Sequence, residues 1–246
     1  MDIVVDHFTR RAEYYDRSSR WCTDPALHAA TVAAVAPEPS HHLLDVACGT
    51  GLVSRALRPH VARITGLDPT PAMSEQSRDV IDALVQGSAE AMPFADNTFD
   101  RIVCRQGTQF MDDRGAVREM VRVVKPGGRV VLVHLCAYGD ADRDEYFAIL
   151  RHRNPARRNF YLRGDLAKLL VDAGCDRVEI RDYVSDEDVD AWADNKAIGD
   201  APREAIREVY RNASPAFLAL HGVRMADGRI LDKMLFALAI GWKRGG

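Results

Sequence analysis

The sequence predicts an α/β fold: a doubly wound, seven-stranded, mostly parallel sheet of the Rossmann-like type, with helical substrate-cover insertions. Two observations support this prediction. Short apolar runs alternate with stretches of helical periodicity along most of the 246 residues, as in a parallel sheet covered on both faces. In addition, the first apolar run, Leu43–Val46, leads into a tight glycine turn that opens a helix.

Each element follows from a local pattern of apolar residues. Runs rich in Val, Ile and Leu predict strands near 42–47, 61–67, 83–86, 99–104, 128–135, 177–184 and 234–242. Apolar residues at three- and four-residue spacing predict helices near 51–59, 71–81, 112–123 and 163–173. Residues 2–36 also have a helical pattern, which Pro37 ends.

The composition narrows the class of protein. The net charge is −3 and the isoelectric point about 6.2, so we expect no nucleic-acid partner and no membrane surface. The five cysteines are dispersed and form no C-x-x-C pair, which favours reduced thiols in a cytoplasmic protein. The histidines lack metal-ligand spacing, and no signal peptide or membrane span is expected.

The glycine turn and the next strand predict a nucleoside site. The second strand ends in Asp68, an acid that can accept hydrogen bonds from ribose hydroxyls. A dinucleotide motif has a third glycine where this chain has Ser54. Asp45 would also repel a pyrophosphate, so the loop favours a cationic ligand without phosphates.

The spacing Asp45-x-Ala47-x-Gly49-x-Gly51 resembles the first motif of class I S-adenosylmethionine-dependent methyltransferases. The resemblance implies S-adenosylmethionine as cofactor, S-adenosylhomocysteine as product, and no metal. It also implies that these four residues belong to the cofactor site.

Later segments extend the resemblance. Asp68 and Pro69 stand where the family binds the ribose, and Met73 stands where a side chain lies against the adenine. Residues 86–94 resemble the third motif, commonly G-D-A-E-x-L-P-F, with Ser88 in place of the aspartate that caps the adenine amino group. Ala89 follows as an adenine contact. We expect Glu90 to be a helix or loop residue rather than a ligand.

Residues 99–110 resemble the fourth-strand motif, which places Arg105 and Gln106 at the cofactor. Arg105-Gln106-Gly107-Thr108 differs from the Asn/Asp-Pro-Pro-Tyr/Phe of DNA and glutamine N-methyltransferases, which counts against those acceptors. Residues 8–16 resemble the N-terminal helix of the quinone-biosynthesis methyltransferases, so Tyr15, together with Tyr14, is expected to shield the sulfonium.

We therefore expect one methyltransferase domain, 1–246. Its parts are an N-terminal helical lid, a cofactor-binding core and two substrate-cover insertions, at 1–36, 37–135, 138–160 and 185–229. Ligands of open α/β sheets bind beyond the carboxyl ends of the strands, and long insertions are uncommon unless they have a function. Plain helical padding is the alternative interpretation of these insertions.

An oxygen acceptor needs a base to remove its proton, and histidine is the commonest one. His134, at the end of the fifth strand, and His221, in the second insertion, are the candidate catalytic residues. Either can instead be structural. The arginines of 151–158 can bind an acidic substrate or simply form a solvated face.

The predicted function is methyl transfer to an O or C atom of a small aromatic, quinone-like or polyketide-like molecule, by a monomer or homodimer. The apolar and aromatic content of residues 185–229 motivates this acceptor class. Two alternatives stay open: a non-methylating cyclisation or rearrangement, and a non-catalytic cofactor-binding module.

Overall fold

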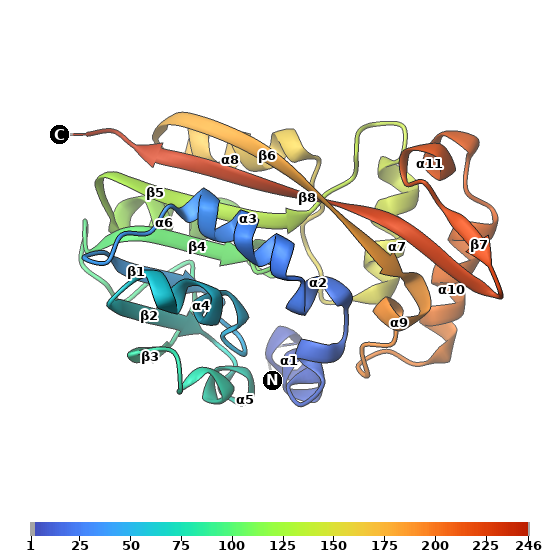
Figure 1. Cartoon of the computed structure of the whole chain (residues 1–246), viewed down its shortest axis with the longest axis horizontal. Coiled ribbons are helices and arrows are strands. Elements are labelled where there is room, and N and C mark those ends of the chain that lie inside the picture. The colour runs from blue at the N-terminus through green and yellow to red at the C-terminus, as the bar shows by residue number, and fades with distance from the viewer. Residues whose placement is uncertain (1–2, 246) are drawn as a thin grey trace.

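The computed structural model describes residues 3–245 and shows one mixed sheet between two layers of helices (Figure 1). In this part of the chain the sheet has eight strands, in the order β3-β2-β1-β4-β5-β8-β6, with β7 paired to β8. The strands are β1 (His42–Val46), β2 (Arg63–Asp68), β3 (Ala83–Gln86), β4 (Phe99–Arg105), β5 (Val124–Leu135), β6 (Cys175–Asp188), β7 (Arg224–Ala226) and β8 (Arg229–Lys243). The predicted fold class is confirmed.

The α-helices are α1 (Ile3–Arg11), α2 (Arg20–Thr23), α3 (Pro25–Val35), α4 (Leu52–Leu57), α5 (Pro71–Ser74), α6 (Asp113–Val123), α7 (Arg143–Arg153), α8 (Arg163–Asp172), α9 (Val189–Ala193), α10 (Asp200–Arg211) and α11 (Pro215–Leu220). Helices α1 to α3, α4, α6 and α8 lie in ranges predicted to be helical, whereas α7 and α9 to α11 lie in the two predicted insertions. Short 3₁₀ turns include η1 (Tyr15–Arg17), η3 (Glu75–Ser77) and η4 (Thr108–Phe110).

The sheet separates two apolar cores. Leu43 and Val131 belong to the core beneath α3 and α4, whereas Leu44 and Leu132 belong to the core beneath α6 and α8. Neighbouring residues of one strand face opposite sides, so strands buried on both faces read as continuous apolar runs. This explains why the sequence located β1, β4 and β5 closely.

The direction of the strands sets the position of the site. Strands β1 to β5 pair in parallel, while β8 is antiparallel to both β5 and β6. The carboxyl ends of β1, β2, β4 and β5 therefore meet at one edge, where α1 crosses (Figure 1). Helices α7, α9, α10 and α11 gather together at the same end of the molecule.

The C-terminal strands differ from the prediction. A short additional strand, β7, forms a hairpin with β8, and β6 and β8 remain paired through Asp188 and Leu231. The sequence did not predict this extension of β6, because its buried residues, Ser185 and Glu187, are polar. Glu187 accepts hydrogen bonds from the backbone N–H groups of Arg20 and Trp21, so a carboxylate occupies an apolar-looking position.

The helix predicted over 71–81 is also shorter, because α5 ends at Ser74 and a 3₁₀ turn follows. The Ser74 hydroxyl donates to the carbonyl of Thr70, and the Ser77 hydroxyl donates to that of Ser74. Such local side-chain bonds compete with regular helix.

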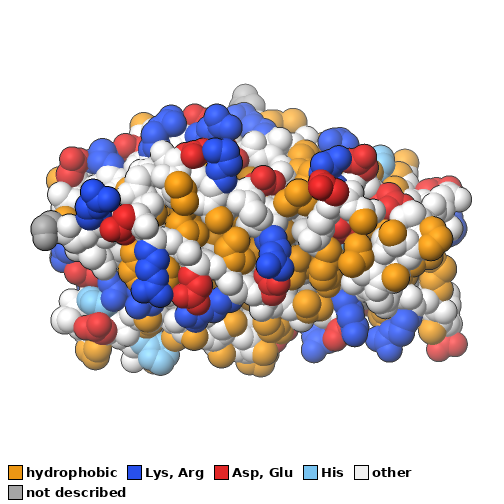
Figure 2. Space-filling model, turned by 90° about the horizontal axis from the view of Figure 1, so that it is seen from above, with side chains coloured by type: hydrophobic (Ala, Val, Ile, Leu, Met, Phe, Trp, Pro, Cys, Tyr) orange, Lys and Arg blue, Asp and Glu red, His pale blue; other side chains and the backbone are white. Residues whose placement is uncertain are grey.

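The surface carries charges of both signs. Figure 2 shows Lys and Arg interspersed with Asp and Glu on the face that it presents. Many of these charges form exposed ion pairs, such as Arg10 with Asp6 and Arg55 with Asp79. Exposed pairs of this kind contribute little to stability.

Candidate functional site

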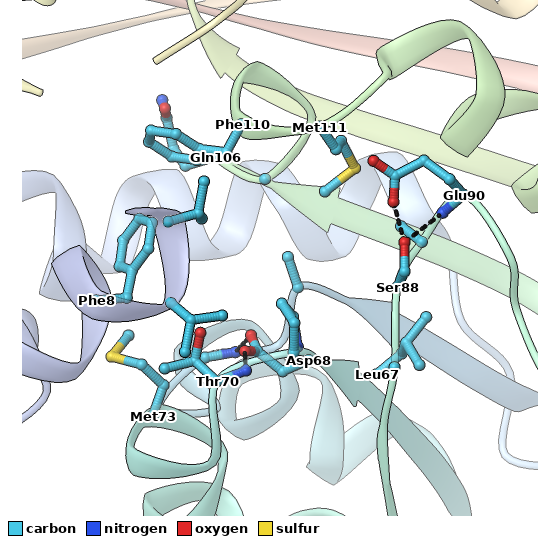
Figure 3. A pocket seen from close by; sticks show the side chains of 18 of the residues that line it. Phe8, Leu67, Asp68, Thr70, Met73, Ser88, Glu90, Gln106, Phe110 and Met111 are labelled. Atoms are coloured by element: carbon cyan, nitrogen blue, oxygen red, sulfur yellow. Dashed lines mark hydrogen bonds between the residues drawn. The ribbon is translucent and has the colours of Figure 1, made fainter. Parts of the chain in front are cut away.

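A main cleft lies at the carboxyl ends of the parallel strands, and residues of α1 line it. Its walls come from the ends of β1, β2, β3 and β4, from the loops that follow them, and from α1 (Figure 3). The lining residues are Val4, Val5, Phe8, Tyr15, Ala47, Gly49, Leu67, Asp68, Pro69, Thr70, Met73, Gly87, Ser88, Ala89, Glu90, Arg105, Gln106, Gly107, Phe110, Met111 and Arg158.

Asp68 is the buried acid of this cleft. One carboxylate oxygen accepts a 2.9 Å hydrogen bond from the Gly49 N–H, and the other accepts a 2.8 Å bond from the Thr70 N–H. Burial raises the pKa of Asp68, although the two backbone bonds oppose that shift. Each oxygen keeps a second lone pair, so the carboxylate can still accept from a pair of ligand hydroxyls.

The glycine loop brings its backbone close to the cleft. Gly49 has a φ of +52°, and a Cβ there would stand 3.3 Å from the Met73 methyl group. Gly51 has a φ of +81°, and a Cβ there would stand 2.6 Å from the Ser77 Cβ. Gly49 therefore shapes the cleft, whereas Gly51 allows α4 to pack against η3.

Asp45 supports the loop from below. Its carboxylate accepts a 2.6 Å hydrogen bond from the Ser54 hydroxyl, and burial raises its pKa to about 6. Asp45 and Gly51 do not line the main cleft. The other predicted cofactor residues do line it: Tyr15, Ala47, Gly49, Asp68, Pro69, Met73, Ser88, Ala89, Arg105 and Gln106.

Two lining residues at strand ends have a strained backbone. Ala47, after β1, has a φ of +56°, and Gln106, after β4, has a φ of +55°. Residues other than glycine seldom adopt this conformation, and such strain clusters at ligand sites. Gly107 then passes close to the first loop, because a Cβ there would lie 2.7 Å from the Ala47 Cβ.

The wall formed by the β3 loop holds a carboxylate that the sequence did not assign. Glu90 lines the cleft, hydrogen-bonds to the Ser88 hydroxyl, and accepts a 2.9 Å bond from the Asp112 N–H (Figure 3). Ser88 stands in place of the aspartate of the family motif, whereas Glu90 corresponds to the glutamate that the motif itself carries, so this wall keeps one of the two acids.

Aromatic side chains form the opposite wall. Phe8 from α1 packs edge-on against Phe110, with ring centroids 5.0 Å apart, and lies 6.2 Å from Tyr15 (Figure 3). Burial raises the pKa of Tyr15 to about 12, so its phenol stays neutral. Tyr14 is 45% exposed and does not line the cleft.

His134 lies away from the main cleft. It is fully buried, its Nε2 lies 3.0 Å from the Thr108 hydroxyl, and its ring contacts Tyr161 edge-on. Burial lowers the pKa of His134 to about 3. His134 lies at the end of β5, as predicted. Its side chain points into the core rather than toward the main cleft, so the structure does not support a catalytic role.

His221 is enclosed by two carboxylates. Its Nε2 lies 3.0 Å from Asp142 and its Nδ1 2.8 Å from Asp232, and its ring stacks on Phe217. Burial lowers the pKa of His221, but the two carboxylates outweigh burial and raise it to about 9. His221 is fully buried and lies outside the main cleft, so the structure gives no support for a catalytic role there.

The predicted arginine segment divides among several environments. Arg158 lines the main cleft, Arg151 lies over the Phe160 ring at the surface, and Arg153 and Arg157 line a smaller cavity next to the main cleft. The sequence did not single out Phe110, Met111 or Glu90 as ligand contacts, although all three follow strand ends.

Three further observations concern the described range, 3–245. No group of three His, Cys, Asp or Glu side chains in this range is placed to hold a metal ion. None of the helices there is long and apolar enough to cross a membrane. Its cysteines, Cys22, Cys48, Cys104, Cys136 and Cys175, are all free and buried.

The fold and the main cleft indicate a nucleoside-binding methyltransferase, and comparison with known proteins gives the same class. The Methyltransferase domain family matches residues 44–132. A demethylmenaquinone methyltransferase of Beutenbergia cavernae is 31% identical over 200 residues, which cover 79% of this chain and 78% of that protein. The chain belongs to the class I S-adenosylmethionine-dependent methyltransferases and is an enzyme of that class.

Within the class, the chain is similar to several proteins. The uncharacterised methyltransferase YcgJ of Bacillus subtilis is 39% identical over 125 residues, but these span only 47% of this chain and 49% of YcgJ. The YcgJ crystal structure has a TM-score of 0.81 at 24% identity, covering 89% of this chain and 98% of that one. The [4+2]-cyclase SpnF shares the fold with a TM-score of 0.61 at 21% identity, covering 90% and 82%.

Proposed function

We propose that the enzyme transfers the methyl group of S-adenosylmethionine to an O or C atom of a small aromatic, quinone-like or polyketide-like molecule. One observation carries this proposal: the main cleft has a polar floor and an aromatic wall and is roofed by α1. A roofed cleft suits a small acceptor better than a nucleic acid. The similarity to demethylmenaquinone methyltransferases supports a quinone-like acceptor.

The residues present fit the cofactor. Asp68 has free lone pairs for the ribose hydroxyls, and the close approach at Gly49 leaves room for the amino-acid portion. Leu67, Met73 and Ala89 provide an apolar surface for the adenine, with the Ser88–Glu90 pair at its edge as acceptor. When bound, the cofactor supplies an activated methyl group on a sulfonium.

The protein's part in the reaction is alignment and exclusion of water. Tyr15 and Phe8 offer aromatic faces to a cation, a contact worth about 0.5–2 kcal/mol. Holding acceptor and methyl group in line is the larger contribution, up to about 7–11 kcal/mol. Neither His134 nor His221 reaches the main cleft, so we propose that catalysis relies on this alignment rather than on a histidine base.

We further propose that the protein is a cytoplasmic monomer or homodimer without a nucleic-acid or membrane partner. The free, buried cysteines within 3–245 suit a reducing compartment. The lid role of 1–36 and the cover roles of 138–160 and 185–229 are part of the same proposal. Their support is that α1 lines the main cleft and α7 reaches the cavity beside it.

The first experiment is calorimetry with S-adenosylmethionine and S-adenosylhomocysteine. We expect micromolar binding by the wild type that is lost in Asp68→Ala and kept in Asp79→Ala, whose carboxylate is an exposed partner of Arg55. An acceptor screen that measures S-adenosylhomocysteine follows. Absence of cofactor binding would contradict the proposal.

The fold is also that of a [4+2]-cyclase, so fold alone does not establish methyl transfer. Acceptor converted without S-adenosylhomocysteine would favour a cyclisation or rearrangement instead. Cofactor binding without turnover on any acceptor would favour a non-catalytic module.

A further inference from the structure

A second cavity adjoins the main cleft. It is much smaller and shares Phe8, Tyr15, Gln106 and Phe110 with the main cleft. Its remaining lining residues are Arg11, Trp21, Gln109, Leu135, Leu150, Arg153, Asn154 and Arg157. A molecule that occupies both spaces therefore contacts these four shared side chains.

Three arginines line this second cavity, and none of the described residues around it is Asp or Glu. Arg11 is 2% exposed, lies over the Phe8 and Tyr15 rings, and donates a 3.4 Å hydrogen bond to the Ser18 hydroxyl. Within residues 3–245, Arg11 forms no ion pair with a carboxylate, and its Nε has no hydrogen-bond partner.

The other two arginines are held by neutral groups. Arg153 is 8% exposed and donates to the Trp192 carbonyl at 3.0 Å and to the Ser19 hydroxyl at 3.1 Å. Arg157 donates from Nε to the Asn159 carbonyl at 3.0 Å, and its Nη2 is buried without a partner. In the part of the chain described, neither side chain makes an ion pair.

Further donors around the second cavity are also unsatisfied. The amide nitrogens of Gln106 and Asn154 are buried without partners, and the side chains of both residues are at least nine-tenths buried. Buried polar groups in folded proteins are normally hydrogen-bonded, and buried charges are normally paired. One acceptor that lines the cavity, the Gln109 Oε1, is unpaired too, but the unpaired donors outnumber it and favour a bound group rich in acceptors.

Burial, together with repulsion between the positively charged side chains around the second cavity, lowers the pKa values of groups there. Burial and the neighbouring Arg11 lower the pKa of Arg153 to about 9, and burial lowers that of Arg157 to about 10. Burial and Arg11 also lower the pKa of His7, on the same helix, to about 3. The carboxylate of Glu187 acts to raise the pKa of Arg153, but within the described residues the two side chains form no ion pair, and Glu187 accepts from the Arg20 and Trp21 N–H groups and from Ser185.

We propose that the second cavity binds an anionic group, a carboxylate or a phosphoryl group, carried by the methyl acceptor. The inference rests on the proposed function and specifies its substrate class. Arginine suits this task because its planar donors match both kinds of oxyanion. When the second cavity holds the anionic group, the apolar part of the acceptor lies against Phe8 and Phe110 and extends into the main cleft, where the methyl donor binds.

The amino-acid carboxylate of the cofactor offers the same chemistry, and the structure favours the acceptor. The main cleft has arginines of its own, Arg105 and Arg158, whereas Arg11, Arg153 and Arg157 line only the second cavity. These three also come from α1, α7 and the loop after α7, outside the cofactor-binding core.

The test is calorimetry of the S-adenosylhomocysteine complex with benzoate and with inorganic pyrophosphate, and with benzamide as the neutral match for benzoate. We expect at least one anion to bind and benzamide not to bind. Arg157→Gln should weaken the anion at least tenfold, and so should Arg11→Met. Arg151→Gln is the matched control, since Arg151 lies in the same region but is exposed over Phe160.

The two sources of the anion are separated with 5′-methylthioadenosine, which lacks the amino-acid portion of the cofactor. If the arginines serve the acceptor, both nucleosides keep their affinity in Arg157→Gln and Arg11→Met. A tenfold loss for S-adenosylhomocysteine alone would assign the arginines to the cofactor and overturn the proposal.

Thermal unfolding of the unliganded variants adds a readout that does not depend on activity. Removing a partly buried charge that makes no ion pair within the described residues should leave the Tm of Arg157→Gln unchanged or higher. A lower Tm with undiminished anion binding would make the arginine structural and overturn the proposal. Failure of both anions to bind a protein that binds S-adenosylhomocysteine would overturn this inference alone, whereas failure to bind S-adenosylhomocysteine contradicts the proposed function.

Discussion

The carboxylate of Asp68 accepts a 2.9 Å hydrogen bond from the backbone N–H of Gly49, which ties the end of β2 to the turn after β1. Its other oxygen accepts from the Thr70 N–H, so a single buried acid holds two loops of the main cleft in place. The residue expected to bind the ribose therefore also builds the pocket around it.

Because of this double role, a substitution at Asp68 should lower both the cofactor affinity and the stability of the protein. Asp68→Asn keeps the size of the side chain but replaces one acceptor oxygen with a donor that faces a backbone N–H. We expect S-adenosylhomocysteine affinity to fall by at least tenfold and stability to fall by about 1–3 kcal/mol, the cost of unsatisfied buried groups. Calorimetry and urea unfolding check both, with Asp79→Asn as control; an unchanged Kd would contradict the assignment.

The setting of His221 predicts a pH dependence of stability. Its pKa in the folded protein, about 9, lies above the ordinary value of 6.5, so the protonated form is stabilised by folding. This contribution is complete below pH 6.5 and is lost as the pH rises toward 9. One pKa unit corresponds to about 1.4 kcal/mol, so the loss amounts to a few kcal/mol.

Urea unfolding between pH 6 and pH 9.5 measures that loss. His221→Gln should be less stable at pH 6 and should lack most of the fall between pH 6.5 and 9. Equal slopes for the variant and the wild type in this range would show that the histidine is not charged in the fold.

His134 provides a contrasting prediction, because it lies outside the main cleft. His134→Gln should keep kcat within a few-fold of the wild type once an acceptor is found. We expect stability to fall by about 1–3 kcal/mol, because the buried hydrogen bond with Thr108 is disturbed. A hundredfold drop in kcat in a folded variant with normal cofactor affinity would restore His134 as a catalytic candidate.

Two glycines with similar backbone angles should differ in their tolerance of alanine. Gly51 and Gly127 have φ values of +81° and +75°, but only at Gly51 does a Cβ meet a neighbour, Ser77, at 2.6 Å. We expect Gly127→Ala to cost about 1–2 kcal/mol from the backbone angle alone. Gly51→Ala should cost about 1–3 kcal/mol more from overpacking, and equal urea midpoints would refute the packing role.

The aromatic contact between α1 and the cleft predicts an effect on ligand affinity. Phe8→Ala should weaken S-adenosylhomocysteine several-fold, because Phe8 lines the main cleft and packs on Phe110. Tyr14→Ala is the control, since that side chain is 45% exposed and outside the cleft. Equal Kd values for the two variants would contradict a lid role for α1.

The shortfalls of the sequence prediction have physical causes. The extension of β6 was missed because Ser185 and Glu187 occupy its buried positions, and periodicity detects apolar burial only. His134 was placed at the correct strand end, but the side of the sheet on which its ring lies depends on register and on the partner Tyr161. Glu90 matches the glutamate of the family motif, but only the tertiary structure shows that it lines the main cleft beside Ser88.

The sequence by itself determined the α/β class, the cofactor loop and Asp68, because strand, glycine turn, helix and acid lie within one contiguous unit whose geometry is local. Only the tertiary structure decided that Arg11, Arg153 and Arg157 meet in one cavity without a carboxylate, and that Phe8 faces Phe110. Arg11 lies more than a hundred positions from Arg153 and Arg157, and Phe8 lies about a hundred positions from Phe110. Their proximity depends on how α1 and α7 pack over the end of the sheet, which no local pattern encodes.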